Sequence, residues 1–235
     1  MKTLIKRYFN EYGFNPDNQT IDLFIKYADL LFEENKRVNL TALSGEKEIV
    51  VKHFLDSIII LKYRDLNGKK AIDLGTGAGF PGIPLKIMSP QMEITLVDSL
   101  KKRCLFLEKT IKELGFQSVM VKNERAENLG QNKDYRGSYD YSFSRAVANT
   151  RILLELHAPL LKVGGEMFLL KGPAIDEEIA DAQNAARELG VELVDILRYE
   201  LPEDYGQRTV AIYQKTLETP AKYPRRPGIP EKRPL

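Results

Sequence analysis

The chain has 235 residues, 43% hydrophobic and 29% charged, so it can form one large domain with an extension and bury a substantial core. Its net charge of +2 does not by itself indicate a nucleic-acid partner, its single cysteine excludes an internal disulfide, and only two histidines argue against a structural zinc site. No apolar run reaches the length of a membrane span and the N-terminus lacks a signal-peptide core, so we expect a cytoplasmic monomer without a metal or a membrane partner.

Apolar residues at helical spacing predict helices in the N-terminal part of the chain, which contains no phosphate loop. We expect these helices over residues 4–9, 21–32 and 46–63, with a turn through 35–39. We interpret residues 1–65 as a helical cap on an α/β core.

Strands and helices alternate after Asn67-Gly68, which predicts a mainly parallel sheet covered on both faces over residues 66–217. The final two strands are joined without a helix, so we expect that pair to be antiparallel. The expected strands are 71–74, 92–98, 119–121, 139–144, 166–170, 191–199 and 209–214. The expected helices are one from about 82 to 88, then 99–114, 150–161 and 175–189, with a loop at 123–129 and a turn at 162–165.

The most informative stretch directly follows the first predicted strand and reads Asp73-x-Gly75-x-Gly77-x-Gly79. Glycine permits the dihedral angles of a tight turn and leaves room for a ligand against the backbone. The run is similar to the first motif of methyltransferases that depend on S-adenosylmethionine (AdoMet). Residues 77–82 also fit the dinucleotide pattern G-x-G-x-x-G, and a plain tight turn would show the same letters.

The rest of the chain favours AdoMet over NAD. An antiparallel final strand pair and the run 160–165 are similar to the class I AdoMet-dependent methyltransferase fold, and no room remains for a second substrate domain. Asp98 can accept hydrogen bonds from both ribose hydroxyls, or cap the next helix together with Ser99. Asp73 can orient the glycine loop and the methionyl ammonium. Glu127 can lie near the adenine amino group or be a solvated loop acid.

The absence of two known sequence features narrows the choice of methyl acceptor. The fourth strand ends in residues 144–147, Ser-Arg-Ala-Val, rather than the Asn-Pro-Pro-aromatic signature of enzymes that methylate amino groups of adenine or cytosine. Cys104 lies on the periodic face of a helix, so we interpret it as core rather than as the nucleophile that carbon methylation of cytosine needs.

Histidines give no clear acid–base constellation either. His157 suits packing within an amphipathic helix, whereas His53, Asp56 and Ser57 share one helix face as either a buried polar cluster or a catalytic one. An acceptor with a free lone pair, such as guanine N7, needs no general base, only a position in line with the sulfonium methyl. The sequence fits that reaction class.

At this point the sequence resembles the bacterial RsmG family (glucose-inhibited division protein B, GidB). The resemblance implies transfer of a methyl group from AdoMet to N7 of one guanosine, the 527-equivalent, in the 16S ribosomal RNA of the small subunit. Its most specific parts are the Gly-Phe-Pro-Gly-Ile-Pro run and the tail Tyr-Pro-Arg-Arg-Pro-Gly-Ile-Pro. The matching stretches are residues 39–42, 53–57, 73–85, 96–99, 125–127, 144–147 and 223–230.

The motifs and the resemblance together predict the cofactor site. By the resemblance alone, the cofactor contacts are Gly75, Phe80, Ala126, Glu127 and Arg145. Arg145 can bind a carboxylate or phosphate in the pocket, where it can also position the guanine, or form a structural ion pair; we favour the pocket. No other catalytic residue is predicted. The predicted cofactor-binding set is Asp73, Gly75, Gly77, Gly79, Phe80, Asp98, Ala126, Glu127 and Arg145.

Residues 218–235 form a basic, proline-rich tail with Glu231 as its acid after residue 220. Without the resemblance, a disordered, solubilising end is as good an interpretation. With it, we predict contact with ribosomal RNA, and expect deletion of residues 222–235 to weaken RNA binding more than AdoMet binding. A small-molecule methyltransferase and a non-catalytic AdoMet- or RNA-binding protein remain as alternatives. The predicted RNA-binding residues are Lys222, Arg225, Arg226, Lys232 and Arg233.

Overall fold

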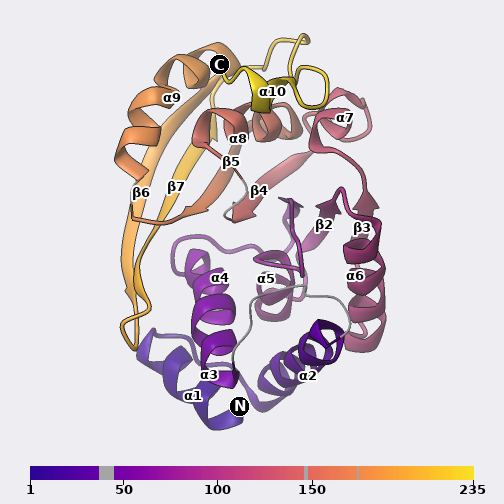
Figure 1. Cartoon of the computed structure of the whole chain (residues 1–235), viewed down its shortest axis with the longest axis vertical. Coiled ribbons are helices and arrows are strands. Elements are labelled where there is room, and N and C mark those ends of the chain that lie inside the picture. Colours follow the sequence, from indigo (N-terminus) through magenta and orange to yellow (C-terminus); the bar gives the residue numbers. More distant parts are fainter. Residues whose placement is uncertain (37–44, 146–147, 174) are drawn as a thin grey trace.

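The computed structural model describes residues 1–36, 45–145, 148–173 and 175–235 (Figure 1). The predicted turn at 35–39 lies partly outside these ranges. The stretches 39–42 and 146–147, which belong to the resemblance, lie outside the described residues altogether. Within the described part of the chain, no helix is long and apolar enough to cross a membrane.

A seven-stranded sheet runs through the described chain in the order β3-β2-β1-β4-β5-β7-β6. Strands β1 to β5 pair in parallel, whereas β7 lies antiparallel between β5 and β6. The sequence predicted the mainly parallel sheet and the antiparallel final pair, and both are confirmed. The strands are β1 (Lys70–Leu74), β2 (Glu93–Asp98), β3 (Val119–Asn123), β4 (Tyr139–Arg145), β5 (Leu161–Lys171), β6 (Val191–Leu201) and β7 (Gly206–Lys215).

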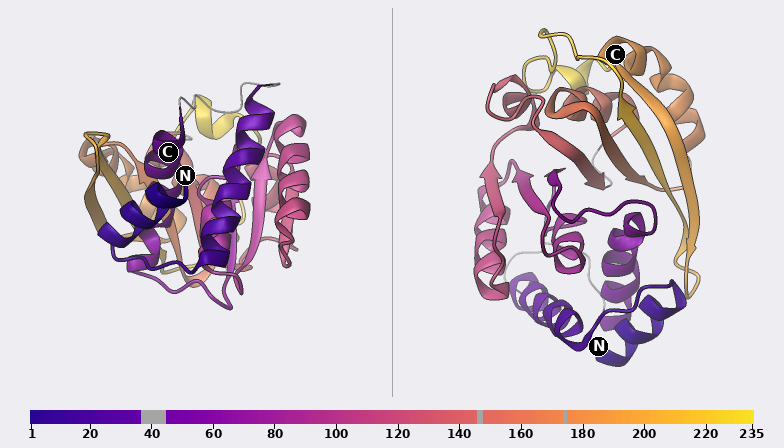
Figure 2. Two further views of the ribbon diagram at one scale, coloured as in Figure 1. Left: turned by 90° about the horizontal axis from the view of Figure 1, so that it is seen from below. Right: turned by 180° about the vertical axis from the view of Figure 1, so that it is seen from behind.

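Helices cover both faces of the sheet because successive strand residues point to opposite faces. In β1, Ala71 packs into one hydrophobic cluster, and Ile72 and Leu74 into the other. Figure 1 shows α8, α9 and α10 above the sheet and α5 with the N-terminal helices below it, and Figure 2 shows both layers from other sides. The helices after the first strand are α5 (Gly82–Met88), α6 (Lys101–Leu114), α7 (Ala126–Gln131), α8 (Thr150–His157), α9 (Ile175–Leu189) and α10 (Ile229–Lys232).

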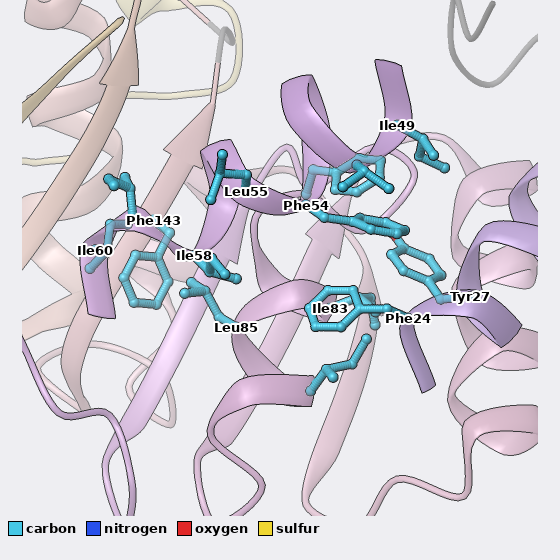
Figure 3. Close-up of a cluster of buried hydrophobic side chains, with 14 of the residues drawn as sticks. Phe24, Tyr27, Ile49, Phe54, Leu55, Ile58, Ile60, Ile83, Leu85 and Phe143 are labelled. Atoms are coloured by element: carbon cyan, nitrogen blue, oxygen red, sulfur yellow. The ribbon is translucent and has the colours of Figure 1, made fainter. Parts of the chain in front are cut away.

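The N-terminal segment is helical where the apolar spacing predicted it. Its middle turns, however, widen to π geometry, which is uncommon and frequent at functional sites. Figure 3 shows Phe24, Tyr27 and Phe54 packed beside Ile83 of α5, and these residues belong to one hydrophobic cluster with the sheet. The elements are α1 (Lys2–Glu11), α2 (Asn18–Asn35), α3 (Glu46–Glu48), the π-helix η1 (Ile49–Leu55), α4 (Asp56–Ile58) and the 3₁₀ helix η2 (Ile59–Lys62).

The turn predicted at residues 162–165 is wrong. Strand β5 already begins at Leu161, which pairs with Tyr139, and the register shifts before the next pair. A Cβ on Gly165 would lie 3.0 Å from the carbonyl oxygen of Asp140. Gly164 and Gly165 therefore lie in an irregular part of strand β5, where two backbone segments approach closely, and not in a turn between two elements.

Three element boundaries also differ from the prediction. The expected loop at 123–129 contains the short helix α7. Helix α6 has Leu100 rather than Ser99 at its N-cap position, and the amide of Leu100 donates to Asp98. The predicted helix 150–161 leaves α geometry after His157 and ends in a 3₁₀ turn, η3 (Ala158–Leu160). The predicted stop of α6 at Gly115 is confirmed, in a left-handed conformation.

Candidate active site

The glycine turn after β1 needs its glycines for two different reasons. Gly75, Gly77 and Gly79 all have positive φ, at 67°, 63° and 108°, where a side chain is strained. Gly79 is also sterically confined, because an added Cβ would lie 2.6 Å from Ile83 Cγ1 and 2.8 Å from the hydroxyl of Tyr27. The turn thus packs directly between α2 and α5.

Hydrogen bonds from three elements hold the turn in place. The amide of Gly77 donates to Asp98 Oδ2 at 3.0 Å, which joins the turn to the end of β2. Arg103 on α6 lies 3.2 Å from the same carboxylate oxygen. The hydroxyl of Tyr27 donates to the carbonyl oxygen of Ala78 at 2.7 Å. The peptide groups of the turn are therefore fixed before any ligand arrives.

Asp73 lies directly beneath the turn and is fully buried. Its Oδ2 accepts hydrogen bonds from the hydroxyl of Thr76 at 2.6 Å and from the amide of Gly82 at 2.9 Å. Its Oδ1 has no hydrogen-bond partner among the described residues. Burial raises the pKa of Asp73 to about 7, although those two hydrogen bonds oppose the shift. A buried acceptor without a donor is costly, so this oxygen is suited to a donor from a ligand.

A cavity of about 370 Å³ opens at the carboxyl ends of β1 and β2. This is where parallel α/β sheets bind ligands. Four of the predicted cofactor residues line it, namely Gly75, Asp98, Ala126 and Glu127. The full lining, over the described residues, is Leu74, Gly75, Val97, Asp98, Ser99, Glu124, Arg125, Ala126, Glu127, Ala148, Asn149, Ile152, Leu153, Leu156, Pro230 and Glu231.

The cavity combines an apolar wall with acidic edges. Leucine and isoleucine side chains of α8 form the wall, and the lining carries four carboxylates against one guanidinium. Glu127 lies in the first turn of α7 and is nearly buried. Its Oε1 accepts the amide hydrogen of Gly228 at 3.0 Å and lies 3.7 Å from Arg125 Nη2. This composition suits a flat apolar group that carries amino and hydroxyl donors and a positive charge.

Phe80 and Arg145 lie beside this cavity, outside its described lining. The ring of Phe80 packs against Tyr27, His53 and Phe54, with centroid separations of 5.6, 4.8 and 6.3 Å. The guanidinium carbon of Arg145 lies 4.8 Å from the centroid of the same ring. Together they form a cation–π platform at the end of β4.

The π-helix η1 and its next turn supply the partners of Arg145. Its Nη1 donates to the carbonyl oxygen of Lys52 at 3.0 Å and lies 3.3 Å from Asp56 Oδ2, and its Nη2 lies 2.8 Å from His53 Nδ1. Burial, and then the charge of Arg145, lower the pKa of His53 to about 3, so its ring is neutral near pH 7. Ser57 donates its hydroxyl to the carbonyl oxygen of His53. Both interpretations of Arg145 therefore meet here: it forms an ion pair, and it does so next to the glycine turn.

Sequence reasoning missed two members of this polar group. The hydroxyl of Tyr199 donates to Asp56 Oδ1 at 2.8 Å, and Arg208 Nε lies 3.9 Å from the same oxygen. Both come from the β6–β7 hairpin, more than 140 residues along the chain from Asp56. No local pattern in the sequence marks them.

The five basic residues of the tail do not share one environment. Arg225 is bound to the buried carboxylate of Glu155 on α8. Lys222 pairs with Glu188 at 2.9 Å on the surface. The other three, Arg226, Lys232 and Arg233, are exposed to solvent. Cys104 and His157 both lie in the protein interior.

Two further points concern a metal site and the cavity residues that the sequence did not predict. Within the described ranges, no group of three or more His, Cys, Asp and Glu side chains is arranged to hold a metal ion. The lining residues that the sequence did not predict for this site include Ile152, Leu156 and Pro230. The sequence predicted only that the aliphatic residues of α8 lie in a helix, and only that Pro230 belongs to the tail.

Comparison with known proteins gives one consistent result. A profile of the GidB family, described as rRNA small subunit methyltransferase G, matches residues 20–204. A Carboxydothermus hydrogenoformans protein named ribosomal RNA small subunit methyltransferase G is 56% identical over 235 residues, covering 100% of both chains. A protein of the same name from Alkaliphilus metalliredigens is 42% identical, covering 100% of this chain and 98% of its own.

Solved structures share the fold at low sequence identity. A SAM-dependent methyltransferase from Methanosarcina mazei matches with a TM-score of 0.53 and 17% identity, covering 68% of this chain and 98% of that chain. TrmN from Thermus thermophilus matches with the same TM-score and identity, covering 77% of this chain and 53% of that chain. The predicted class I AdoMet-dependent methyltransferase fold is confirmed.

Proposed function

The chain belongs to the GidB family of ribosomal RNA small subunit methyltransferase G proteins, and from this premise we propose that it methylates N7 of one guanosine in 16S ribosomal RNA, the 527-equivalent, with AdoMet as donor. The observation that supports the cofactor best is the meeting of Gly75, Asp98 and Glu127 in one cavity at the carboxyl ends of the strands. Three separate elements converge there on a site of nucleoside size.

The residues present fit AdoMet group by group. Asp98 offers a carboxylate for the ribose hydroxyls, and its own hydrogen bonds to Gly77 and Leu100 fix its orientation. Glu127 and the apolar wall of α8 suit the adenine with its amino group. The unpartnered Oδ1 of Asp73 suits the methionyl ammonium, directly or through a water molecule. AdoMet itself supplies an electrophilic methyl group, which a nitrogen lone pair can attack.

The polar group around Arg145 fits the acceptor base. Guanine N7 carries a free lone pair, so the protein must hold the base rather than remove a proton from it. An arginine can donate to guanine O6, and the ring of Phe80 packs against the guanidinium of Arg145 and so helps to fix its position. His53 is neutral and already engaged with Arg145, so its part is to fix that arginine and not to act as an acid. The acceptor is thus positioned beside the glycine turn.

The RNA partner is supported by the family and by charge. Arg226, Lys232 and Arg233 are exposed in the tail that runs over the cofactor cavity, where they can reach phosphates of the small-subunit RNA. We infer a cytoplasmic enzyme that acts as a monomer on the RNA or on the small subunit that contains it.

A direct assay tests the whole proposal. The purified protein is incubated with methyl-labelled AdoMet and with ribosomal RNA or small subunits from a strain that lacks its own enzyme, and the label is mapped by cleavage at N7-methylguanine. One labelled guanosine is expected. Label on another atom contradicts the N7 assignment. AdoMet binding without transfer to RNA contradicts the RNA substrate and favours a small-molecule acceptor or a binding-only protein.

A further inference from the structure

The C-terminal tail is held against the protein by a clamp of partly buried hydrogen bonds. Arg136, which follows α7, donates to the carbonyl oxygens of Tyr223 at 2.7 Å and Thr219 at 2.7 Å. Gln131 at the end of α7 donates to the carbonyl oxygen of Pro224 at 2.7 Å. Main-chain carbonyls accept every one of these bonds, so the clamp fixes the path of the backbone rather than one side chain.

Next along the tail, Arg225 forms the strongest anchor. Its Nη2 and Nε bind the carboxylate of Glu155 at 2.5 and 2.9 Å, and its main-chain amide donates to the same group at 2.8 Å. Glu155 is 0% exposed, so Arg225 supplies the opposite charge that this buried carboxylate needs. The neighbouring turns of α8 carry Ile152 and Leu156, which line the cofactor cavity. The anchor therefore joins the tail to the helix that forms the apolar wall.

After the anchor, the tail turns over the cavity. The amide of Gly228, which has a left-handed conformation, donates to Glu127 Oε1 at 3.0 Å. Pro230, which is buried, and Glu231 then form part of the cavity lining. Figure 1 shows α10 lying beside α8 and near α7. Residues from the end of the chain thus face Asp98 and Gly75 across the same volume.

We propose that residues 225–231 are a wall of the AdoMet cavity, with Arg225 as the positioning residue that sets Pro230 against the adenosine end of the cofactor. This inference rests on the proposed function and goes beyond it, because it gives the tail a role in cofactor binding and not only in RNA contact. It also adds to the expectation from the sequence, which was that deletion of the tail weakens RNA binding more than AdoMet binding. Deletion of residues 222–235 would leave Glu155 buried without a partner and remove part of the cavity, so AdoMet binding would not be spared.

Point variants of the full chain test the wall. AdoMet affinity is measured by calorimetry without RNA, and KM for AdoMet, kcat and the melting temperature are measured with small subunits as substrate. We expect Arg225→Ala to raise the Kd of AdoMet about tenfold and Pro230→Ala about threefold, with kcat at saturating AdoMet changed by less than about twofold. Arg225→Lys keeps the charge and should restore part of the affinity.

Two controls keep the outcome interpretable. Lys133→Ala removes an exposed cation between α7 and Arg136, outside the cavity and the tail, and should leave the Kd of AdoMet unchanged. Pro230→Ala leaves the Arg225–Glu155 pair intact, so it remains informative if Arg225→Ala unfolds the protein. Folded Pro230→Ala that binds AdoMet like the unaltered protein overturns the wall while the methyltransferase assignment stands. Failure of the unaltered protein to bind AdoMet overturns both.

Discussion

Two neighbouring groups of side chains border the glycine turn, and they differ in what satisfies their charges. In the cofactor cavity, Asp98 and Glu127 accept hydrogen bonds from main-chain amides while they still face an open volume of about 370 Å³. Around Arg145, the guanidinium bonds to the carboxylate of Asp56 and the neutral ring of His53, and Phe80 covers it. The first arrangement receives a ligand, whereas the second holds one arginine in a fixed place.

The comparison predicts which measured quantity each group controls. Changes in the cavity should act on the affinity for AdoMet, and changes around Arg145 should act on the rate of methyl transfer. A cavity variant that changes mainly the rate of methyl transfer, or a variant around Arg145 that changes mainly the affinity for AdoMet, would contradict this division of roles.

The largest expected effect comes from Asp98. Asp98→Ala removes the acceptor for Gly77 and Leu100 and the partner proposed for the ribose, so we expect AdoMet binding to weaken by about 3 kcal/mol, or roughly 150-fold. Calorimetric titration with AdoMet measures this. Glu108→Ala, which removes an exposed carboxylate from α6, is the matched control and should bind normally. A loss of less than threefold for Asp98→Ala would place the ribose elsewhere.

Arg145 should show the opposite behaviour. Arg145→Lys keeps the charge but loses the two-pronged contact with His53 and Asp56, so we expect kcat to fall by about 2 kcal/mol, or roughly 30-fold, while the Kd of AdoMet changes less than about threefold. Single-turnover methylation of small subunits separates the two quantities. Arg198→Lys on the exposed part of β6 serves as control. If Arg145→Lys instead weakens AdoMet binding and leaves kcat unchanged, the arginine belongs to the cofactor site.

The sequence predicts the cavity better than the polar group because its residues lie close to strong local patterns. Gly75 and Asp98 each follow a short apolar run, and the ends of parallel strands meet at one edge of a sheet. Helix α7 escaped prediction because it is only six residues long and contains Gly130, which local propensity disfavours.

Long-range contacts explain the remaining failures. Tyr199 and Arg208 reach Asp56 only because β7 inserts between β5 and β6, which no spacing in the sequence reveals. Composition marked the tail as free and basic, yet the environment of Arg225 is set by Glu155, 70 residues away on α8. Propensity and periodicity describe neighbours in sequence, whereas these contacts depend on tertiary packing.

The third prediction concerns His157, the buried histidine at the end of α8. Its ring nitrogens have no hydrogen-bond partner among the described residues. Burial lowers the pKa of His157 to about 3. The unfolded chain binds the proton near pH 6.5, so stability falls as pH drops below that value and continues to fall until pH reaches about 3. The group's contribution to this loss is about 2 kcal/mol at about pH 5.

His157→Leu should remove that part of the pH dependence. We expect the variant to match the unaltered protein within about 1 kcal/mol at pH 7.5 and to exceed its stability by about 2 kcal/mol at about pH 5. Urea unfolding at the two pH values measures both. His53 shares the lowered pKa, so its own slope should persist in the variant. If the free energies of unfolding of the two proteins differ by the same amount at both pH values, His157 takes up a proton in the folded protein as readily as in the unfolded chain, and its pKa is not lowered.

The smallest predicted effect tests whether Asp73 belongs to the cofactor side of the comparison. Burial raises the pKa of Asp73 to about 7, so the carboxylate is mainly ionised above that pH and mainly neutral below it. The proposed partner of its free Oδ1 is a cationic ammonium, which binds the ionised form more tightly. Affinity for S-adenosylhomocysteine, which keeps the ammonium group, should therefore rise by up to about tenfold between about pH 6 and about pH 8. Asp73→Asn should lose this rise and retain only the titration of the ligand itself. The same pH profile in both proteins would assign Asp73 to the glycine turn alone, held by Thr76 and Gly82, and would leave the ammonium to another acceptor.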